Sequence, residues 1–263
     1  GTIRILLSDA NNLIATPGTP TLTMTTAQFE ALKLQPVANS GANIPRVRMS
    51  VTEYEVDAAG ARLSGIAGAT KTADVSILVT AVTDAVDLTI NGSDAPHTVT
   101  ISEDATLDLK ALLSADFQDL DGSEQRDIII SNPAGNGTIV VNGAEVLGGA
   151  FVRIPFNAPG NNLETSITGF PAISIKAANN FSGDLNGITV TLSAKDSDSD
   201  SPTAATATLT DSVILNLHVT PVAGDVTTSP VSTTEDTRVE FLNSLALTDT
   251  DGSEAITAIT VNA

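Results

Sequence analysis

The chain has no cysteine and no tryptophan, and aromatic residues make up only 3% of its 263 residues. Without cysteine there are no disulfide bonds, no thiolate metal sites and no thiol nucleophile. Because large aromatic side chains are scarce, a hydrophobic core has to be built from valine, isoleucine, leucine and alanine. Glycoside hydrolysis is also disfavoured, because its substrate cleft is usually lined with aromatic platforms.

Basic residues are few as well: 12 Lys and Arg stand against 31 Asp and Glu, which gives a net charge of −19. This balance repels nucleic acids and anionic membrane surfaces, so we expect neither as a partner. No apolar run is long enough to span a bilayer, and direct membrane insertion is not expected. Many of the carboxylates gather in short Asp-rich loops, which favours a bound cation. The alternative is an acidic surface that serves solubility.

The most informative feature present is an internal repeat. Glu103-Asp104 followed by Asp119–Glu124 (DLDGSE) returns as Glu235-Asp236 followed by Asp249–Glu254 (DTDGSE). The offsets, 235 − 103 = 132 and 249 − 119 = 130, differ by two deleted residues. A period of this length is that of one ordinary domain, so the sequence predicts a tandem array.

The repeat predicts three parts: residues 1–86 as the later part of one unit, 87–222 as a complete unit and 223–263 as the opening part of the next. The sequence has no initiator Met and no charged and apolar leader. We therefore expect an excerpt of a much longer chain. The alternative is a subunit whose C-terminal part completes the N-terminal part of the next copy, in a head-to-tail polymer.

Short alternating or β-branched runs separated by Gly-, Asn- and Pro-rich turns predict an all-β fold of tandem β-sandwich repeats. The segment Leu107–Leu113 is too short for an independent helix and is expected to form one turn beside a strand, and Ala27–Leu34 is interpreted as a strand. The expected strands are Val75–Val82, Thr98–Ile101, Ile128–Ile130, Thr138–Val141, Phe151–Ile154, Ile173–Ile175, Ile188–Leu192, Ala205–Leu209 and Val213–Val219.

The pattern Asp-x-Asp-Gly-x-Glu places three carboxylates on one tight turn, and Gly stands where the backbone must reverse. Calcium prefers six to eight hard oxygen ligands, so we expect a calcium site. The alternative is an Asp-Gly turn with solvated carboxylates. The candidate ligands in the two copies are Glu103, Asp104, Asp119, Asp121 and Glu124, and Glu235, Asp236, Asp249, Asp251 and Glu254.

A second acidic set lies late in the complete unit, at Asp196, Asp198 and Asp200. Asp211, before the last strand, and Asp84 and Asp87, at the junction of units, are further candidates for these metal sites. A solvated acidic loop is the competing interpretation. An ion held between neighbouring units would remove hinge freedom and turn a flexible string of domains into a stiff rod.

These residues resemble the cadherin-like, immunoglobulin-like repeats of very large bacterial surface adhesins, including those of the RTX type. The matching features are the Glu-Asp pairs, the two Asp-rich loops, Asn132–Gly135, Ala178–Gly183 and Val219–Ala223. The resemblance implies an extracellular, non-catalytic extender at the bacterial cell surface, which is stiffened by calcium and contacts neighbouring repeats of its own chain or identical subunits. The glycine-rich calcium nonapeptides of the RTX type are absent.

Three other functions remain open at this point. An enzyme is the least favoured, because His97 and His218 lack a nearby nucleophile in a strained turn. A calcium-dependent module for a surface glycan or peptide would use the Gly- and Asn-rich segment Asn142–Thr168. A polymer would cover the apolar strand edges expected at residues 1–5 and 256–261.

Overall fold

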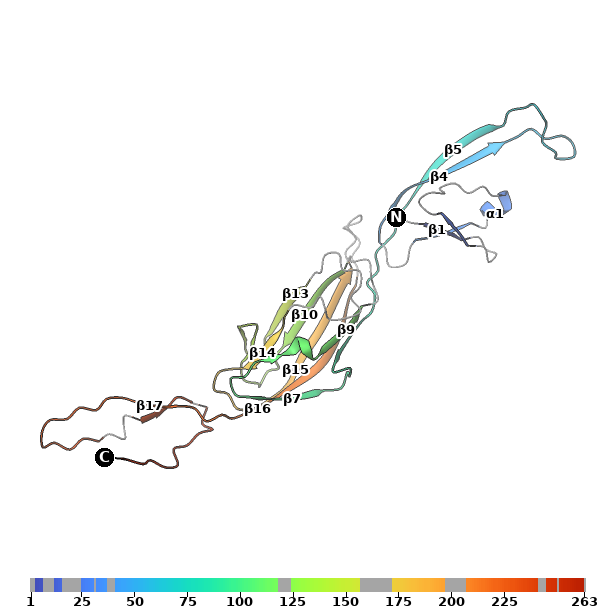
Figure 1. The fold of residues 1–263 in the computed structure, drawn as a ribbon. Coiled ribbons are helices and arrows are strands. Elements are labelled where there is room, and N and C mark those ends of the chain that lie inside the picture. Colours follow the sequence, from blue (N-terminus) through green and yellow to red (C-terminus); the bar gives the residue numbers. More distant parts are fainter. Residues whose placement is uncertain are drawn as a thin grey trace. The chain divides into compact units, whose positions relative to one another are not determined.

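The computed structural model describes residues 3–6, 12–15, 25–30, 32–36, 41–117, 124–156, 172–196, 207–240, 245–249 and 251–262. The described part is nearly all β-structure (Figure 1), which confirms the predicted all-β sandwich class. It divides into two compact units: residues 1–84, 119–124 and 195–208 form the first, and residues 85–118, 125–194 and 209–263 the second. The tandem repetition and its three parts stay predictions.

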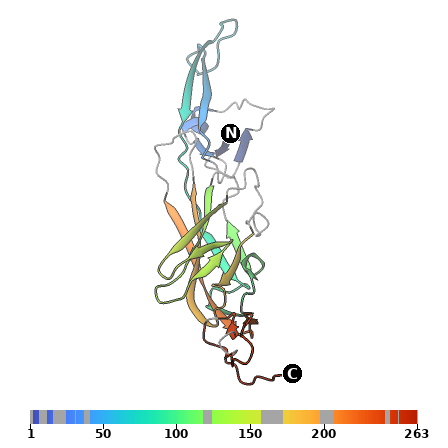
Figure 2. The same cartoon turned by 90° about the vertical axis from the view of Figure 1, so that its left-hand side faces the viewer.

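The second unit holds a β-sandwich, whose strands are seen from two sides in Figures 1 and 2. One sheet has the strand order β13-β10-β15-β16-β7, another has β12-β11-β14-β8, and β6 pairs with β9. Strands β16 and β7 run parallel. The strand bounds are β6 Val86–Ile90, β7 His97–Ser102, β8 Leu107–Asp108, β9 Leu113–Phe117, β10 Glu124–Ser131, β11 Ile139–Val141, β12 Ala144–Val146, β13 Phe151–Phe156, β14 Ser174–Ala177, β15 Gly183–Asp196 and β16 Thr208–Thr220.

The core of this sandwich is aliphatic. Strand β16 alternates, with Val213, Leu215, Leu217 and Val219 buried, because successive side chains of a strand point to opposite faces. These residues join one hydrophobic cluster with side chains from β6, β9, β10, β11, β14 and β15. Every buried hydrophobic residue in the described part is Ala, Ile, Leu or Val, as the scarcity of aromatic residues predicts.

Asparagine side chains stabilise the turns of the second unit. Asn142 and Gly143 connect β11 and β12 with φ of +49° and +83°, a pair of left-handed positions that Asn and Gly tolerate well. The buried Asn132 donates through Nδ2 to the carbonyls of Gly137 and Val146, both at 2.9 Å. The Asn132 side chain, at the start of the Asn-Pro-Ala-Gly segment that follows β10, therefore fixes the adjoining loop through these two hydrogen bonds.

Several expected elements differ in the second unit. The end of the expected strand Ala205–Leu209 and all of the expected strand Val213–Val219 belong to one strand, β16, which is continuous from Thr208 to Thr220. Residues 205 and 206 lie outside the described part. The segment Asn142–Thr168, the candidate recognition segment, contains the strand β12, which was not expected, and β13, which confirms the strand expected at Phe151–Ile154. Residues 157–168 lie outside the described part. The segment Leu107–Leu113 forms β8 and a single 3-10 turn, Leu109–Ala111, as expected for one turn beside a strand.

The first unit contains two small sheets. β1 (Ile3–Leu6) lies between β2 (Asn12–Ala15) and β3 (Lys33–Pro36), so it is not the free edge that the sequence predicts. β4 (Ile44–Glu53) pairs antiparallel with β5 (Ala69–Ile77). The strand expected at Val75–Val82 thus ends at Ile77.

The interpretation of Ala27–Leu34 as a strand is wrong for most of that segment. Thr26–Glu30 forms α1, a short α-helix whose first turn is closed by a hydrogen bond from the Phe29 N–H to the Thr25 carbonyl at 2.9 Å. Ala, Gln and Glu in this stretch are good helix formers, so the local propensity favours a helix over a strand. A strand begins only at Lys33.

The C-terminal part of the second unit is sparsely structured. β17 (Val226–Thr228) pairs antiparallel with β18 (Leu245–Leu247). Residues 256–261, expected as a strand edge, form no strand, and Ile256, Ile259 and Val261 are exposed. Among the described residues no helix is long and apolar enough to cross a membrane.

Candidate metal site

Glu103 lies directly after β7, at the end of the sandwich where the chain leaves it. The Glu103 N–H donates to the carbonyl of Thr220 at the end of the parallel strand β16 (2.9 Å). Its side chain is only 7% exposed, and Oε2 accepts a hydrogen bond from the Val222 N–H at 3.0 Å. The parallel pairing of β7 and β16 therefore places a buried carboxylate beside the start of the following segment.

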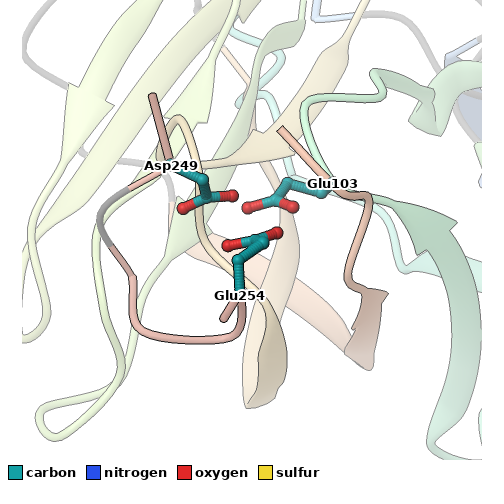
Figure 3. A group of neighbouring side chains, drawn as sticks. All are labelled: Glu103, Asp249 and Glu254. Carbon is teal, nitrogen blue, oxygen red and sulfur yellow. The ribbon is translucent and has the colours of Figure 1, made fainter. Parts of the chain in front are cut away.

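Asp249 and Glu254 lie on the loop after β18. The Asp249 Oδ1 accepts the Asp251 N–H at 3.0 Å, and Gly252, with φ of +90°, allows the chain to turn back. Asp249 is 8% exposed and Glu254 is half-buried. Figure 3 shows the carboxylates of Glu103, Asp249 and Glu254 pointing toward one another from these two parts of the chain.

The three side chains form an acidic cluster. Each contributes a carboxylate oxygen, and these oxygens lie within 4.8 Å of one another. Oε1 of Glu103 and both side-chain oxygens of Glu254 are buried and have no hydrogen-bond partner. Buried charges of one sign at this separation repel, and unpartnered buried oxygens cost free energy. The cluster therefore offers carboxylate ligands, and a bound cation would provide the partner that the buried oxygens lack.

The loop that carries this cluster is fastened to the sandwich by Asp251. Its Oδ2 accepts hydrogen bonds from the Ser182 N–H (2.9 Å) and the Ser182 Oγ (2.7 Å). Its Oδ1 accepts the Ser253 N–H at 2.6 Å. The bond from the Ser182 side chain, together with those from Ser253, lowers the pKa of Asp251 to about 2. Asp251 is therefore charged at neutral pH and anchors the loop.

Asn180 makes a second link at the same place. Its Nδ2 donates to the Thr248 carbonyl and its N–H donates to the Asp104 Oδ1, both at 3.2 Å. Asp104 has φ of +58°, a left-handed conformation that Asp adopts more readily than most residues. The predicted ligands Asp104 and Asp251 thus act in this structure as anchors beside the cluster.

The pKa of Glu103 reflects the opposing interactions within the cluster. The Val222 N–H lowers the pKa of Glu103, whereas burial and the negative charge of Asp249 raise it, and the net pKa lies above the usual value. In a metal-free cluster the charged form of Glu103 is therefore less favoured than it is in an unfolded chain. A bound cation would reverse that preference, because it favours the carboxylate.

Among the described residues, this cluster is the one group of three or more acidic ligands that could hold a metal, and the other predicted ligands that are described do not join it. Glu235 and Asp236, the second Glu-Asp pair, are exposed. Glu124 is the first residue of β10. The remaining members of the two Asp-rich sets, namely Asp119, Asp121, Asp198 and Asp200, lie outside the described residues.

The acidic residues near the start of the second unit have structural partners. Asp211 accepts the Leu88 N–H at 2.7 Å through Oδ2 and the Ser212 N–H at 2.8 Å through Oδ1. Burial, together with the charges of Asp94, Asp211 and Asp116, raises the pKa of Asp87. In the first unit Asp84 is half-buried, and Asp196 is buried with its N–H donating to the Thr83 Oγ1 (2.9 Å).

The sequence did not identify Asn180 and Ser182 as parts of the site. Both lie in the stretch Ala178–Gly183, whose Asn-Asn-Phe-Ser-Gly composition is typical of a turn. A turn-forming Asn or Ser gives no sign of which distant loop it will contact. Comparison with known proteins adds no candidate, since no family model and no curated protein matches the chain.

Proposed function

We propose that this chain is a non-catalytic, extracellular segment of a bacterial surface adhesin or filament, in which calcium joins β-sandwich units into a stiff extender. The observation that carries the proposal is the cluster of Glu103, Asp249 and Glu254. The first comes from the end of the sandwich and the other two from the segment that follows it. An ion in this cluster would tie the sandwich to the next part of the chain.

Calcium fits the donor set better than other common metals. The cluster offers carboxylate oxygens only, whereas structural zinc sites use cysteine and histidine. Magnesium demands a near-ideal octahedron and keeps much of its water, while calcium accepts a flexible shell of six to eight oxygens. Water and main-chain carbonyls would complete that shell.

A mechanical role follows from the way the C-terminal segment is held. The described residues 223–240 are exposed, and β17 and β18 form a ladder of only three residue pairs. The hydrogen bonds of Asp251 and Asn180 fasten the segment at one end, close to three carboxylates that repel one another when no ion is present. Calcium would convert this repulsion into attraction and fix the segment on the sandwich.

The cellular location is inferred from the same chemistry. Extracellular calcium modules bind with dissociation constants of about 10⁻⁴–10⁻³ M, which suits a site assembled from two segments of the chain. The chain has no cysteine, so an ion is the available cross-link in place of a disulfide. The likeness of the repeat to those of bacterial adhesins points in the same direction.

The test is a calcium titration monitored by thermal unfolding and small-angle X-ray scattering. We expect calcium to raise the unfolding midpoint and to give a longer, stiffer particle. The double variant Glu103→Gln/Asp249→Asn should lose both responses, and Glu235→Gln, at the exposed counterpart of Glu103 in the repeat, should retain them. An unchanged midpoint and scattering profile in the unmodified chain would contradict the proposal.

A further inference from the structure

Three tripeptides of the chain fit Asn-x-Ser/Thr, the pattern at which sugars are attached to asparagine. They are Asn91–Ser93 (NGS), Asn136–Thr138 (NGT) and Asn180–Ser182 (NFS), and all three lie within the described part. The sequence alone gives no reason to prefer one of them. The structure distinguishes them, because an asparagine that receives a sugar must be exposed and must have a hydrogen on its side-chain nitrogen that the fold does not use.

The side chain of Asn136 is fully used by the fold. Asn136 is half-buried, and its Nδ2 donates to the Asn132 Oδ1 at 3.1 Å and to the Asn186 carbonyl at 2.9 Å. Its Oδ1 accepts the Asn186 N–H at 3.3 Å. Both hydrogens of the amide nitrogen are therefore engaged, and a sugar in place of either one would break a hydrogen bond between two turns of the sandwich.

The tripeptide that begins at Asn180 is held at all three positions. Asn180 is half-buried, and its Nδ2 donates to the Thr248 carbonyl at 3.2 Å. Phe181 packs against the hydrophobic core. The hydroxyl that completes the pattern, that of Ser182, donates to the Asp251 Oδ2 at 2.7 Å. A transferase could reach this tripeptide only if the loop at Asp251 came off the sandwich.

Asn91 lies in an exposed tight turn after β6. Ile90 and Ser93 exchange two backbone hydrogen bonds, of 3.0 and 3.1 Å. Between them Asn91 and Gly92 have φ of +50° and +74°, as in the two-residue turn that Asn-Gly favours. Every residue from 91 to 96 is exposed. This tripeptide is therefore the accessible one of the three.

The side chain of Asn91 also keeps a hydrogen for a new bond. Its Nδ2 lies 3.0 Å from the His97 Nε2, and because an amide nitrogen is only a donor, Nε2 accepts. This bond uses one of the two hydrogens, so a sugar can replace the other while the bond to His97 is kept. The Ser93 Oγ accepts the Ala95 N–H at 3.2 Å, which is a contact within the same exposed loop.

We propose that Asn91 carries an N-linked sugar and that, of the three tripeptides, only this one is modified in the folded chain. The donor is a sugar activated as a diphosphate ester, and a glycosyltransferase catalyses the transfer. The Asn91 Nδ2 forms a bond to the anomeric carbon, the bond from that carbon to the diphosphate oxygen breaks, and the amide hydrogen passes to a base of the transferase. The proposal goes beyond the calcium-dependent extender, because this turn contributes no residue to the acidic cluster.

The test is incubation of the folded full chain with UDP-glucose and a soluble transferase specific for Asn-x-Ser/Thr, followed by mass spectrometry of the intact chain and of its peptides. We expect a gain of one hexose per chain, located on Asn91. Ser93→Ala should abolish the gain, because it removes the hydroxyl of the pattern and leaves Asn91 in place. Thr138→Val is the matched control, since it removes the corresponding hydroxyl after Asn136, and it should leave the gain unchanged.

Synthetic peptides of residues 88–96, 133–141 and 177–185 separate the effect of the fold from that of the sequence. We expect the transferase to modify all three peptides but only one asparagine of the folded chain. A sugar on Asn136 or Asn180 of the folded chain, an unmodified Asn91, or an unmodified 88–96 peptide would each overturn the proposal. The same mapping on the chain isolated from the cells that make it should find the sugar on Asn91, and a bare Asn91 there would also contradict it.

Discussion

The carboxylates of Glu103 and Asp249 lie side by side, although the two residues belong to different copies of the sequence repeat. Glu103 comes from the Glu-Asp pair of the first copy and Asp249 from the Asp-rich loop of the second. The structure therefore brings together carboxylates from two motifs that lie far apart in the sequence. An ion bound by all three carboxylates would connect the two segments, as proposed above.

Glu103→Gln is predicted to have opposite effects with and without calcium. In chelator the variant should unfold at a higher temperature than the unmodified chain, because one of three mutually repelling carboxylates is removed. In calcium it should unfold at a lower temperature, because a ligand is lost. Differential scanning calorimetry in both buffers measures this crossing, and a variant that shifts in the same direction in both would contradict the assignment.

The pKa of Asp251 predicts an acid-sensitive anchor. This pKa is lowered to about 2 in the fold, below the value of about 3.9 in an unfolded chain. The anchor therefore adds stability above the unfolded pKa and loses it as pH falls through about 2. Ser182→Ala should remove part of this stability at neutral pH and reduce the dependence on acid, which acid titration followed by circular dichroism measures. Equal acid midpoints for the two proteins would count against the anchor.

Asp87→Asn is predicted to stabilise the sandwich at neutral pH. The pKa of Asp87 is raised by burial and by neighbouring carboxylates. Because this pKa is raised in the folded state, the stability that Asp87 contributes is fully present below its unfolded pKa. That stability is lost as the pH rises through the folded pKa. The variant should therefore unfold at a higher temperature than the unmodified chain at pH 7 in chelator, and at the same temperature below about pH 3. A destabilised variant at pH 7 would show that the Asp87 charge is favourable.

Asn132→Ala is predicted to destabilise the sandwich by about 1–3 kcal/mol, because the buried carbonyl of Val146 and the carbonyl of Gly137 lose their donor. Asn186→Ala is the matched control, since the side chain of Asn186 is exposed. Urea unfolding at constant calcium measures both variants. Similar losses of unfolding free energy in the two variants would show that the Asn132 hydrogen bonds contribute little to stability.

Leu192→Ala is predicted to cost about 2–5 kcal/mol, because the side chain is buried in the aliphatic core of the sandwich. The same truncation at Leu209, an exposed position on the neighbouring strand β16, should cost much less. Thermal unfolding of both variants checks the assignment of the core. Comparable losses at the two leucines would contradict it.

Local pattern was sufficient to predict much of the sandwich. The alternation in β16 and the Asn142-Gly143 turn follow from short-range physics, since side chains alternate along a strand and Asn and Gly tolerate left-handed backbone. The helix α1 was not predicted, although Ala, Gln and Glu in this segment favour a helix by their own propensity. Strand ends such as Ile77 depend on pairing with β4, which alternation alone does not reveal.

The candidate site was only partly predictable. The residue types and the turn of Asp249–Glu254 are visible in the sequence, and so is the Glu103-Asp104 pair. Their combination depends on the parallel pairing of β7 with β16 and on hydrogen bonds from Asn180 and Ser182, which are long-range contacts. The burial that leaves Glu103 Oε1 unpartnered follows from that tertiary arrangement.

The most direct measurement is hydrogen exchange of residues 223–262 with and without calcium, in the unmodified chain and in Glu103→Gln. If calcium ties this segment to the sandwich, its amides should exchange more slowly in calcium, and the protection should disappear in the variant while the sandwich strands stay protected. Equal exchange of residues 223–262 in both buffers, with the sandwich intact, would contradict the account.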